Sequence, residues 1–531
     1  MIPNFNSIYN FFKQRIFLDI HEKNYIHFNN KKWKKTSKIT KEKKPSVILV
    51  DLFPWYPHIY IWSYISNILS TKINAEIKYY YFDFYQSNAG KFNLFIRKLV
   101  KIYESFNAKK GITEYDFKYS KKEILNFEKH FKRIKKKKDV INFKIEKLKI
   151  GSLIYDSYVR TTLEPTIKID DRRFKVIFFR SLKIYFEIKK YFNKNNVKCV
   201  IPSHLCYMSY GIISKYAISK KIPVIKLRSD KGGQVSFRIS KIDKYNLNEP
   251  PYYEYRKNFS HFSKDHQVKA LKVGKEILKG RLSGNFDKYL PYMEKSQFRD
   301  KSKKISINKN NKKQKIIIFP HCFYDYPHRF RNMIFNDFYE HALYFMKQSE
   351  KYNEYDWYYK PHPTSLPGHV NIHKVLLKKF PNINYLNKDV SHKEIIRLNP
   401  KCIITNHGSV AHEYASFNIP CVNTGDNHHI NYDFCLHAKS FSHLNEIMSN
   451  LDKYIKKINF DKKQIYEFLY MHNYYYPNLN NENKLIKDEY FITKNTKLNH
   501  SSKILSYIIK KDKTSYKNII KYISDILDQN F

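Results

Sequence analysis

The chain has 531 residues, too many for one ordinary core, so we expect two domains with extensions. A hydrophobic fraction of 42%, including 17% aromatic residues, excludes global disorder. The formal net charge of +50 points to nucleic acid, an anionic membrane surface or an acidic substrate. Lys, Asn, Ile and Tyr are abundant throughout, however, and a biased composition explains the charge about equally well.

The six cysteines form no Cys-x-x-Cys pair, which favours buried thiols in a reducing cytosol over disulfides or zinc. The first residues lack the apolar core and the cleavage site of a signal peptide. Residues 47–69 are too often interrupted by Asp, Pro and His to span a membrane. We therefore expect a cytoplasmic protein.

Residues 1–44 form a basic extension dotted with aromatic residues, which we expect either to lie on an anionic surface or to be a solvated tail. An N-terminal domain is predicted over residues 45–299. Apolar runs in it predict buried strands at residues 46–52, 77–84, 197–202 and 223–227. Helix-like segments separate these runs, and such alternation predicts parallel βαβ units. Residues 115–147 contain the densest basic run and predict an exposed helical insertion.

Residues 300–315 are rich in Lys and Asn, as is typical of a linker. The alternation then restarts over residues 316–455, where a second doubly wound domain is predicted. Its strands are expected at residues 316–319, 357–359, 383–386, 402–405 and 421–423. A helical extension over residues 456–531 follows, with a final amphipathic helix near residues 516–527. The predicted fold class is α/β with two Rossmann-like domains, whose ligands lie outside the carboxyl ends of the strands.

Polar motifs follow three strands of the second domain. His321 and Asp325 come after the first strand, Lys-Pro-His-Pro at residues 360–363 after the second, and Asn-His-Gly-Ser at residues 406–409 after the fourth. In the last motif a strand ends at a small polar loop that opens a helix. Backbone N–H groups and the helix dipole at such a place favour an anion, so phosphate chemistry is the leading hypothesis.

Each of these side chains suits the neutralisation of a departing phosphate. Lys360 supplies a full charge, and His362 and His407 can donate hydrogen bonds. The N–H groups at residues 408–410 can cap the phosphate, and Glu413 can accept from ribose hydroxyls. This arrangement requires no metal.

Structural alternatives exist for the same residues. The Lys-Pro-His-Pro motif can be a rigid exit turn, and His407 can simply satisfy a turn. Ser409 can be only an N-cap, and Glu413 can lie on a solvated helix face. The neighbouring Asp426, His428 and His429 are expected to be surface polar residues and not a metal site.

Several segments together resemble a known group of enzymes. These are FPHCFYDYPH (319–328), MIFNDFYEHA (333–342), DWYYKPHP (356–363), TNHGSVAHEYASFNIP (405–420), IGSLIYDSYVR (150–160) and VIPSHLCYMSYGIISKYAISKKIPVI (200–225). They resemble bacterial surface-polysaccharide glycosyltransferases of GT-B fold. Within that group the segments most resemble capsule polysaccharide biosynthesis proteins, and they resemble Kdo transferases and CDP-glycerol glycerophosphotransferases more distantly. The resemblance spans roughly residues 45–440, and the order and spacing of the motifs are its specific part.

The resemblance implies a metal-independent enzyme whose two domains face a cleft, with the donor held by the C-terminal domain and the acceptor by the N-terminal one. The donor would be a nucleotide-sugar, with no other cofactor. The acceptor would be lipid-linked or a growing polysaccharide of capsule or lipopolysaccharide. By motif, Lys360 and His362 match donor-phosphate contacts. The donor loop and helix match His407, Gly408, Ser409 and Glu413.

An inverting transfer needs a base from the N-terminal domain to take the proton of the acceptor hydroxyl. Asp51 and His204, each at a predicted strand end, are the candidates. Further residues that can face the cleft are Asp156, Arg160, Asp325 and His328. A capped turn or an ion pair within a helical segment is an equally good explanation of these side chains.

Two other classes of function stay open. A glycerophosphotransferase would use the same phosphate site to transfer a phosphorylated alcohol. A nucleic-acid-binding protein would account for the charge and the aromatic residues, but no recognisable RNA or DNA module is present, and we expect no specific nucleic acid. The basic extension and the Tyr-rich helices also suggest a peripheral position at the inner face of the cytoplasmic membrane.

Overall fold

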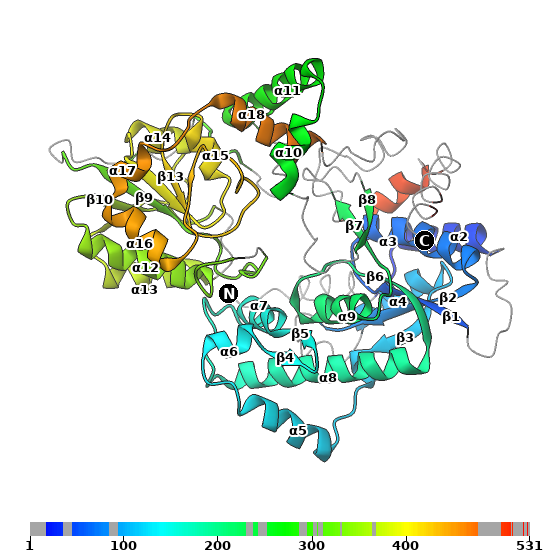
Figure 1. Ribbon diagram of the computed structural model, residues 1–531. Coiled ribbons are helices and arrows are strands. Elements are labelled where there is room, and N and C mark those ends of the chain that lie inside the picture. Colours follow the sequence, from blue (N-terminus) through cyan, green and yellow to red (C-terminus); the bar gives the residue numbers. More distant parts are fainter. Residues whose placement is uncertain are drawn as a thin grey trace, which may run out of the picture.

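The computed structural model describes most of the chain and shows two α/β domains (Figure 1). Each domain is built on a six-stranded sheet. The described residues are 17–34, 45–83, 94–229, 237–242, 252–285, 295–300, 305, 312–329, 332–363, 368–475, 501–510, 512, 524 and 528.

The N-terminal sheet has the strand order β3-β2-β1-β6-β7-β8. Its strands are β1 (Ser46–Asp51), β2 (Ala75–Tyr81), β3 (Lys109–Thr113), β6 (Asn196–Ile201), β7 (Val224–Ser229) and β8 (Phe237–Ile242). All neighbours pair in parallel except β8, which runs antiparallel to β7. The four predicted strands are therefore confirmed. The edge strands β3 and β8 were not predicted, because neither has a continuous apolar run: β3 is Lys-Lys-Gly-Ile-Thr and begins with two exposed lysines.

The central strand β1 is buried along its whole length, because helices cover both faces of the sheet. Its alternate side chains point to opposite faces. Ile48 and Val50 join a core formed with the helices α2, α3 and α4, and Val47 and Leu49 join a core formed with α7, α8 and α9. These helices are α2 (Ile20–Trp33), α3 (Tyr56–Lys72), α4 (Leu94–Glu104), α7 (Gly151–Thr162), α8 (Arg172–Lys194) and α9 (Tyr207–Ser219).

The C-terminal sheet has the order β11-β10-β9-β12-β13-β14, and all its pairs are parallel. Its strands are β9 (Lys315–Phe319), β10 (Asp356–Tyr359), β11 (Ile383–Tyr385), β12 (Cys402–Thr405), β13 (Cys421–Asn423) and β14 (Leu436–His437). The five predicted strands are present, and only the two-residue β14 was missed. In both sheets the order runs 3-2-1-4-5-6, the order of dinucleotide-binding folds, so the predicted fold class is confirmed.

Helices cover both faces of this second sheet as well. One core lies under α12 (Phe338–Lys351), α13 (His369–Lys379), α16 (Phe441–Ser449) and α17 (Leu451–Ile455). The other lies under α10 (Tyr255–Ser260), α11 (Lys264–Leu282), α14 (His392–Arg397), α15 (Val410–Ala415) and α18 (Lys462–Tyr470). All six cysteines are buried and free, as the sequence predicts.

Two segments pack on a different domain from the one to which the sequence analysis assigned them or next to which they lie in sequence. Helices α10 and α11 were assigned to the N-terminal domain, but they pack on α18 and the C-terminal core. Conversely, Ile504, Leu505 and Ile508 from the C-terminal extension belong to the core of the N-terminal domain. An amphipathic pattern predicts that a helix buries one face but does not identify its partner, and this explains both differences.

The described part of the N-terminal extension includes helix α2, which packs on the N-terminal domain and is therefore not a solvated tail. Tyr25 and Trp33 are buried against α3 and α4, and Asp19 caps the first turn. Lys32 forms an ion pair with Asp512 near the other end of the chain. The rest of the extension, most of the predicted linker at 300–315 and all of the predicted helix near 516–527 except residue 524 lie outside the described residues.

The helical insertion consists of α5 (Lys121–Phe131), α6 (Lys137–Ile141) and a short hairpin of β4 (Lys144–Ile145) and β5 (Leu148–Lys149). Helix α5 lies along α8, at the outer edge of the N-terminal domain (Figure 1). In the part of the chain that the structure describes, no helix is long and apolar enough to cross a membrane.

Candidate active site

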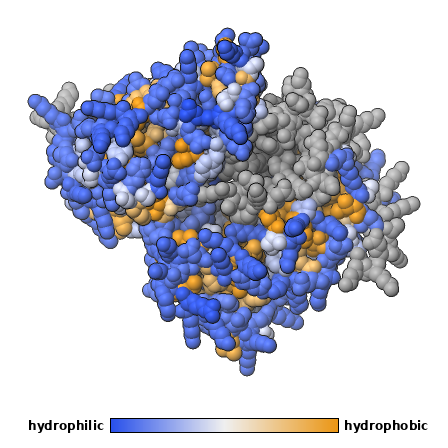
Figure 2. All heavy atoms as spheres, viewed as in Figure 1, coloured by the Kyte–Doolittle hydropathy of each residue, from blue (hydrophilic) through white to orange (hydrophobic). Residues whose placement is uncertain are grey.

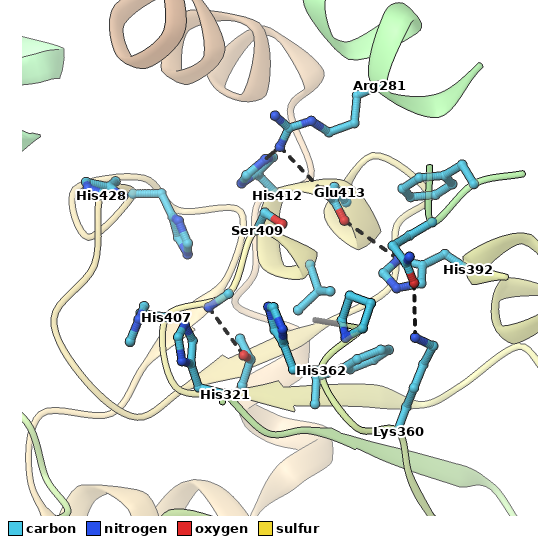
Figure 3. Close-up of a pocket in the computed structure, with 18 of the residues that line it drawn as sticks. Arg281, His321, Lys360, His362, His392, His407, Ser409, His412, Glu413 and His428 are labelled. Carbon is cyan, nitrogen blue, oxygen red and sulfur yellow. Dashed lines mark hydrogen bonds and ion pairs between the residues drawn. The ribbon is translucent and has the colours of Figure 1, made fainter. Parts of the chain in front are cut away.

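A pocket of about 240 Å³ opens at the carboxyl ends of β9, β10 and β12 (Figure 3). It lies where parallel-sheet domains hold their ligands. The structure brings together in its lining all the residues predicted to bind the donor: Lys360, His362, His407, Gly408, Ser409 and Glu413. The lining also contains basic and imidazole side chains from distant parts of the chain: Arg281, His321, Arg329, His392, His412, His428, His429 and His472. Glu413 is the one carboxylate among the described lining residues.

Three histidines from three strand ends lie together in this pocket. The ring centroid of His321 is 4.6 Å from that of His407 and 5.4 Å from that of His362. Burial holds the pKa values of His362 and His407 well below the usual value, and the neighbouring His321 lowers them further. These two rings are therefore neutral near pH 7, where each can donate a hydrogen bond from one ring nitrogen.

Lys360 is buried at the exit of β10, with 1% of its surface exposed. Its Nζ donates to Gln297 Oε1 and to the Lys388 carbonyl, each at 3.3 Å, so both partners are uncharged. Burial lowers the pKa of Lys360 to about 7, and the charge of Arg299 contributes to this shift. A bound anion would stabilise the ammonium form, so this side chain is poised to respond to phosphate.

Glu413 lies in the first turn of α15 and is buried, so the solvated-face alternative is wrong. Arg281 Nη1 donates to its Oε1 at 3.3 Å, and His392 Nδ1 lies 3.7 Å from its Oε2. Arg281 Nη1 also lies 3.2 Å from His412 Nε2. Arg281 was not predicted as a site residue, because it lies 132 residues before Glu413 on a helix assigned to the other domain.

The loop between β12 and α15 is tightly built. The Gly408 N–H donates to Thr405 Oγ1 at 3.3 Å, and a Cβ added at Gly408 would lie only 2.8 Å from that oxygen. Close packing therefore explains the glycine. Ser409 is the N-cap residue of α15, but its side chain makes no cap hydrogen bond. Ser409 lines the pocket.

Asp51 and His204, the candidate bases, lie apart from this pocket lining, at the carboxyl ends of β1 and β6 in the N-terminal sheet. Asp51 accepts hydrogen bonds from the N–H group of Ser203, at 3.0 Å, and from its hydroxyl. The Ser203 hydroxyl also lies 3.0 Å from His204 Nδ1, so the three side chains form a continuous chain. Burial raises the pKa of Asp51 to about 7 and lowers the pKa of His204 to about 4.

Asp156 and His328, two of the predicted cleft residues, join the two domains. Asp156 on α7 lies 2.5 Å from His328 Nδ1, which follows β9. Burial raises the pKa of Asp156, and His328 opposes this shift. The partner of Asp156 thus comes from the other domain and not from its own helical segment.

Further contacts strengthen this junction between the domains. Tyr155 and Thr166 donate to the buried carboxylate of Asp337, which also caps α12. Lys137 Nζ lies 2.6 Å from Glu340 Oε1. The domains are therefore held together through α6, α7 and the start of α12.

Arg160 and Asp325, the other predicted cleft residues, are partly buried and do not line the pocket. Arg160 lies in the last turn of α7. Asp325 follows β9, where its Oδ1 accepts from the N–H of Tyr326 at 3.2 Å.

The Asp426, His428 and His429 cluster is not the surface loop that was expected. Asp426 and His429 are buried, and both histidines line the pocket. The Asp426 carboxylate accepts a hydrogen bond from the hydroxyl of Tyr253. Among the described residues, no group of three or more His, Cys, Asp or Glu side chains could hold a metal ion.

No family model and no curated protein matches this chain. Similar solved structures include the β-Kdo 2,4 transferase of KpsC from Thermosulfurimonas dismutans, at 11% identity over 55% of this chain and 85% of that one, with a TM-score of 0.32. A UDP-GlcNAc 2-epimerase from Neisseria meningitidis, bound to UDP-GlcNAc, has 11% identity over 80% of this chain and 97% of that one, with a TM-score of 0.24. A glycosyltransferase from Rickettsia africae ESF-5 has 10% identity over 90% of this chain and 100% of that one, with a TM-score of 0.25.

These similar structures include a glycosyltransferase and a Kdo transferase. Their identities and TM-scores are low. The fold assignment therefore rests on the two strand orders.

Proposed function

We propose that this protein is a GT-B-type glycosyltransferase that moves a sugar from a nucleotide-activated donor to a surface polysaccharide, in capsule or lipopolysaccharide synthesis. One observation carries the proposal: Lys360, His362 and His407 line a single buried pocket at the carboxyl ends of three neighbouring strands. Sugar transfer from a nucleotide builds negative charge on the departing phosphate oxygen. A pocket rich in cations and N–H donors lowers the barrier to that departure.

In this proposal the C-terminal domain holds the donor. Lys360, in its ammonium form, neutralises the phosphate, and His362 and His407 donate hydrogen bonds to it. Glu413, in the first turn of α15, accepts from a ribose hydroxyl. The basic side chains supply the positive charge that a metal would otherwise provide, so the reaction is metal-independent.

The N-terminal domain then presents the acceptor, which is lipid-linked or a growing polysaccharide. His204 is neutral near pH 7 because its pKa is about 4, and it takes the proton of the acceptor hydroxyl. Asp51, through Ser203, orients the ring. The acceptor oxygen forms a bond to the anomeric carbon as the bond from that carbon to the phosphate oxygen breaks, and the nucleotide leaves with the bonding electrons. A lipid-linked acceptor would bring the protein to the inner face of the cytoplasmic membrane.

The test is a thermal-shift screen of the full chain against CMP, CDP, UDP and GDP. A ligand that binds only the folded state raises the apparent stability, so one nucleotide should raise the unfolding temperature clearly. The same nucleotide should fail to do so in Lys360→Met. A response to CDP-glycerol with turnover of it would indicate a glycerophosphotransferase. Salt-sensitive binding of generic oligonucleotides without any nucleotide response would overturn the transferase proposal.

A further inference from the structure

The helical insertion has an uneven charge distribution that the proposed transfer reaction does not use. Residues 118–149, here called the basic insertion, contain 13 Lys and Arg and 4 Asp and Glu, an excess of nine positive charges (13 − 4). A biased composition explains an excess of lysine anywhere in the chain. It does not explain how the charges are arranged in space.

The acidic side chains of the basic insertion are all occupied locally. Glu123 pairs with Lys183 at 2.7 Å and Glu128 with Lys175 at 2.6 Å, both lysines lying on α8. Glu146 pairs with a third lysine of α8, and Asp139 accepts from two backbone N–H groups of its own segment. The lysines of α8 thus neutralise the insertion's acids, and its own basic side chains remain on the outside.

These outer basic residues are exposed from Lys118 to Lys138, except Lys137, which reaches Glu340 of the other domain. On α5, Lys121, Leu125 and Lys129 follow one another at intervals of four residues and share one face of the helix.

Exposed apolar side chains lie among these charges. Leu125 is 64% exposed and Ile124 is 39% exposed, while Phe127 of the same helix is buried against α8. Tyr119, just before the helix, is 44% exposed. Figure 2 shows a small apolar area within a hydrophilic surface at the lower tip of the molecule, where Figure 1 places α5.

We propose that the basic insertion docks on a lipid surface with anionic headgroups, its lysines lying over the headgroups and Leu125 and Ile124 entering the interface. Basic residues near an anionic leaflet are attracted to it, and apolar side chains on the same face add burial. A single-stranded nucleic acid would instead need a row of aromatic side chains for stacking. The apolar side chains exposed on α5 itself are aliphatic, so the lipid surface is favoured.

Only the biological reason for docking rests on the proposed function: the basic insertion belongs to the domain that would receive a lipid-linked acceptor. Vesicle binding is measured without any nucleotide. A failure of docking and a failure of the transferase proposal are therefore distinguishable.

The experiment is co-sedimentation of the full chain with phosphatidylcholine vesicles that contain about 30% phosphatidylglycerol, at about 0.15 M salt. The test variant combines Lys121→Ala, Lys122→Ala and Lys129→Ala, substitutions that favour the helix. The matched control combines Lys374→Ala, Lys378→Ala and Lys379→Ala, three exposed lysines on α13 beside the exposed Val375. A second pair of variants, Leu125→Ser and Val375→Ser, compares the apolar contributions.

The native protein should bind the anionic vesicles and not pure phosphatidylcholine. The α5 triple variant should bind at least tenfold more weakly and the α13 control within twofold of native, with Leu125→Ser weaker than Val375→Ser. An unchanged unfolding temperature would show that the α5 variant is folded. Three results would overturn the proposal: no binding by the native protein, equal losses in both triple variants, or RNA binding through the α5 lysines without vesicle binding.

Discussion

The two domains share one strand order and differ in the chemistry at the carboxyl ends of their strands. In the C-terminal domain these ends carry Lys360 and a cluster of histidines, with Arg281 and Arg329 nearby. In the N-terminal domain they carry a buried carboxylate, Asp51, linked through Ser203 to His204. The same topology thus builds a basic site in one half and an acid-centred site in the other.

This difference shows that the topology fixes where a site lies, and the side chains fix what it does. Parallel strands bring their carboxyl ends to one edge, so residues far apart in sequence meet there in both domains. A basic edge suits a phosphate that gains negative charge. An edge with a proton acceptor suits the hydroxyl group of an acceptor. In the proposed function the C-terminal domain therefore holds the donor and the N-terminal domain presents the acceptor, and variants on each side can test this assignment.

The largest effect is expected on the acceptor side. His204→Ala should lower turnover about 100-fold or more, because a general base contributes about 10²–10⁴ in rate. The Kd of the nucleotide should stay unchanged, because His204 lies outside the donor pocket. Steady-state kinetics and nucleotide titration measure the two quantities. The exposed His261 provides the control, as His261→Ala should change neither. Turnover within twofold of native would remove His204 from the proposed mechanism.

The second-largest fall in turnover is expected for a substitution in the proposed donor pocket. Lys360→Met should lower turnover more than about tenfold, or about 1.4 kcal/mol of barrier, and should weaken nucleotide binding. Methionine keeps an unbranched apolar chain and removes the cost of burying an amine, so the unfolding temperature should not fall. Lys379→Ala, on the exposed face of α13, is the control. Native kinetics in Lys360→Met would mean that the phosphate binds elsewhere.

The sequence predicted those parts of the two sites that depend on local patterns, namely apolar runs that end at polar motifs. The apolar runs that became β9, β10 and β12 ended at polar motifs, and parallel topology required those motifs to meet. Lys360, His362 and His407 were found in this way. Asp51 and His204 were found by the same rule, but the rule could not tell that Ser203 connects them.

The remaining parts of the site depend on tertiary contacts that no local pattern records. Arg281 reaches Glu413 because α11 packs on the C-terminal core, although the helix precedes the linker. The bond between Asp156 and His328 depends on how the two domains meet. Likewise, α2 was taken for an extension because its sequence is strongly polar, and only the packing of Tyr25 and Trp33 makes it part of the core.

A third prediction concerns the histidine cluster. His407→Ala should lower turnover about tenfold or more, because it removes a hydrogen-bond donor that acts on the departing phosphate oxygen. The folded state should persist, since His407 lies at the pocket wall, where its ring contacts those of His321 and Phe338. Thermal unfolding checks the fold, and single-turnover kinetics check the chemical step. A variant with unchanged single-turnover rates would show that His407 contributes only packing.

The smallest effect is a pH dependence of nucleotide binding that comes from Lys360. Its pKa is about 7 in the free protein, and only the ammonium form attracts phosphate. Raising the pH therefore removes the charge and weakens binding, by about fivefold between pH 7 and pH 8 for a single group with this pKa. His362 and His407 do not oppose this trend, because their pKa values lie well below 6.5 and both are already neutral in this range.

Isothermal titration at several pH values measures this dependence, and buffers of different ionisation enthalpy report the proton taken up on binding. Lys360→Arg should keep its charge throughout and bind with little change between pH 7 and pH 8, because the guanidinium group does not titrate there. If the native protein and Lys360→Arg had the same pH profile, the titrating group would not be Lys360. If nucleotide binding grew stronger as the pH rose, the donor site would not depend on a protonated amine. The basic edge of the C-terminal sheet would then not be the feature that binds the phosphate.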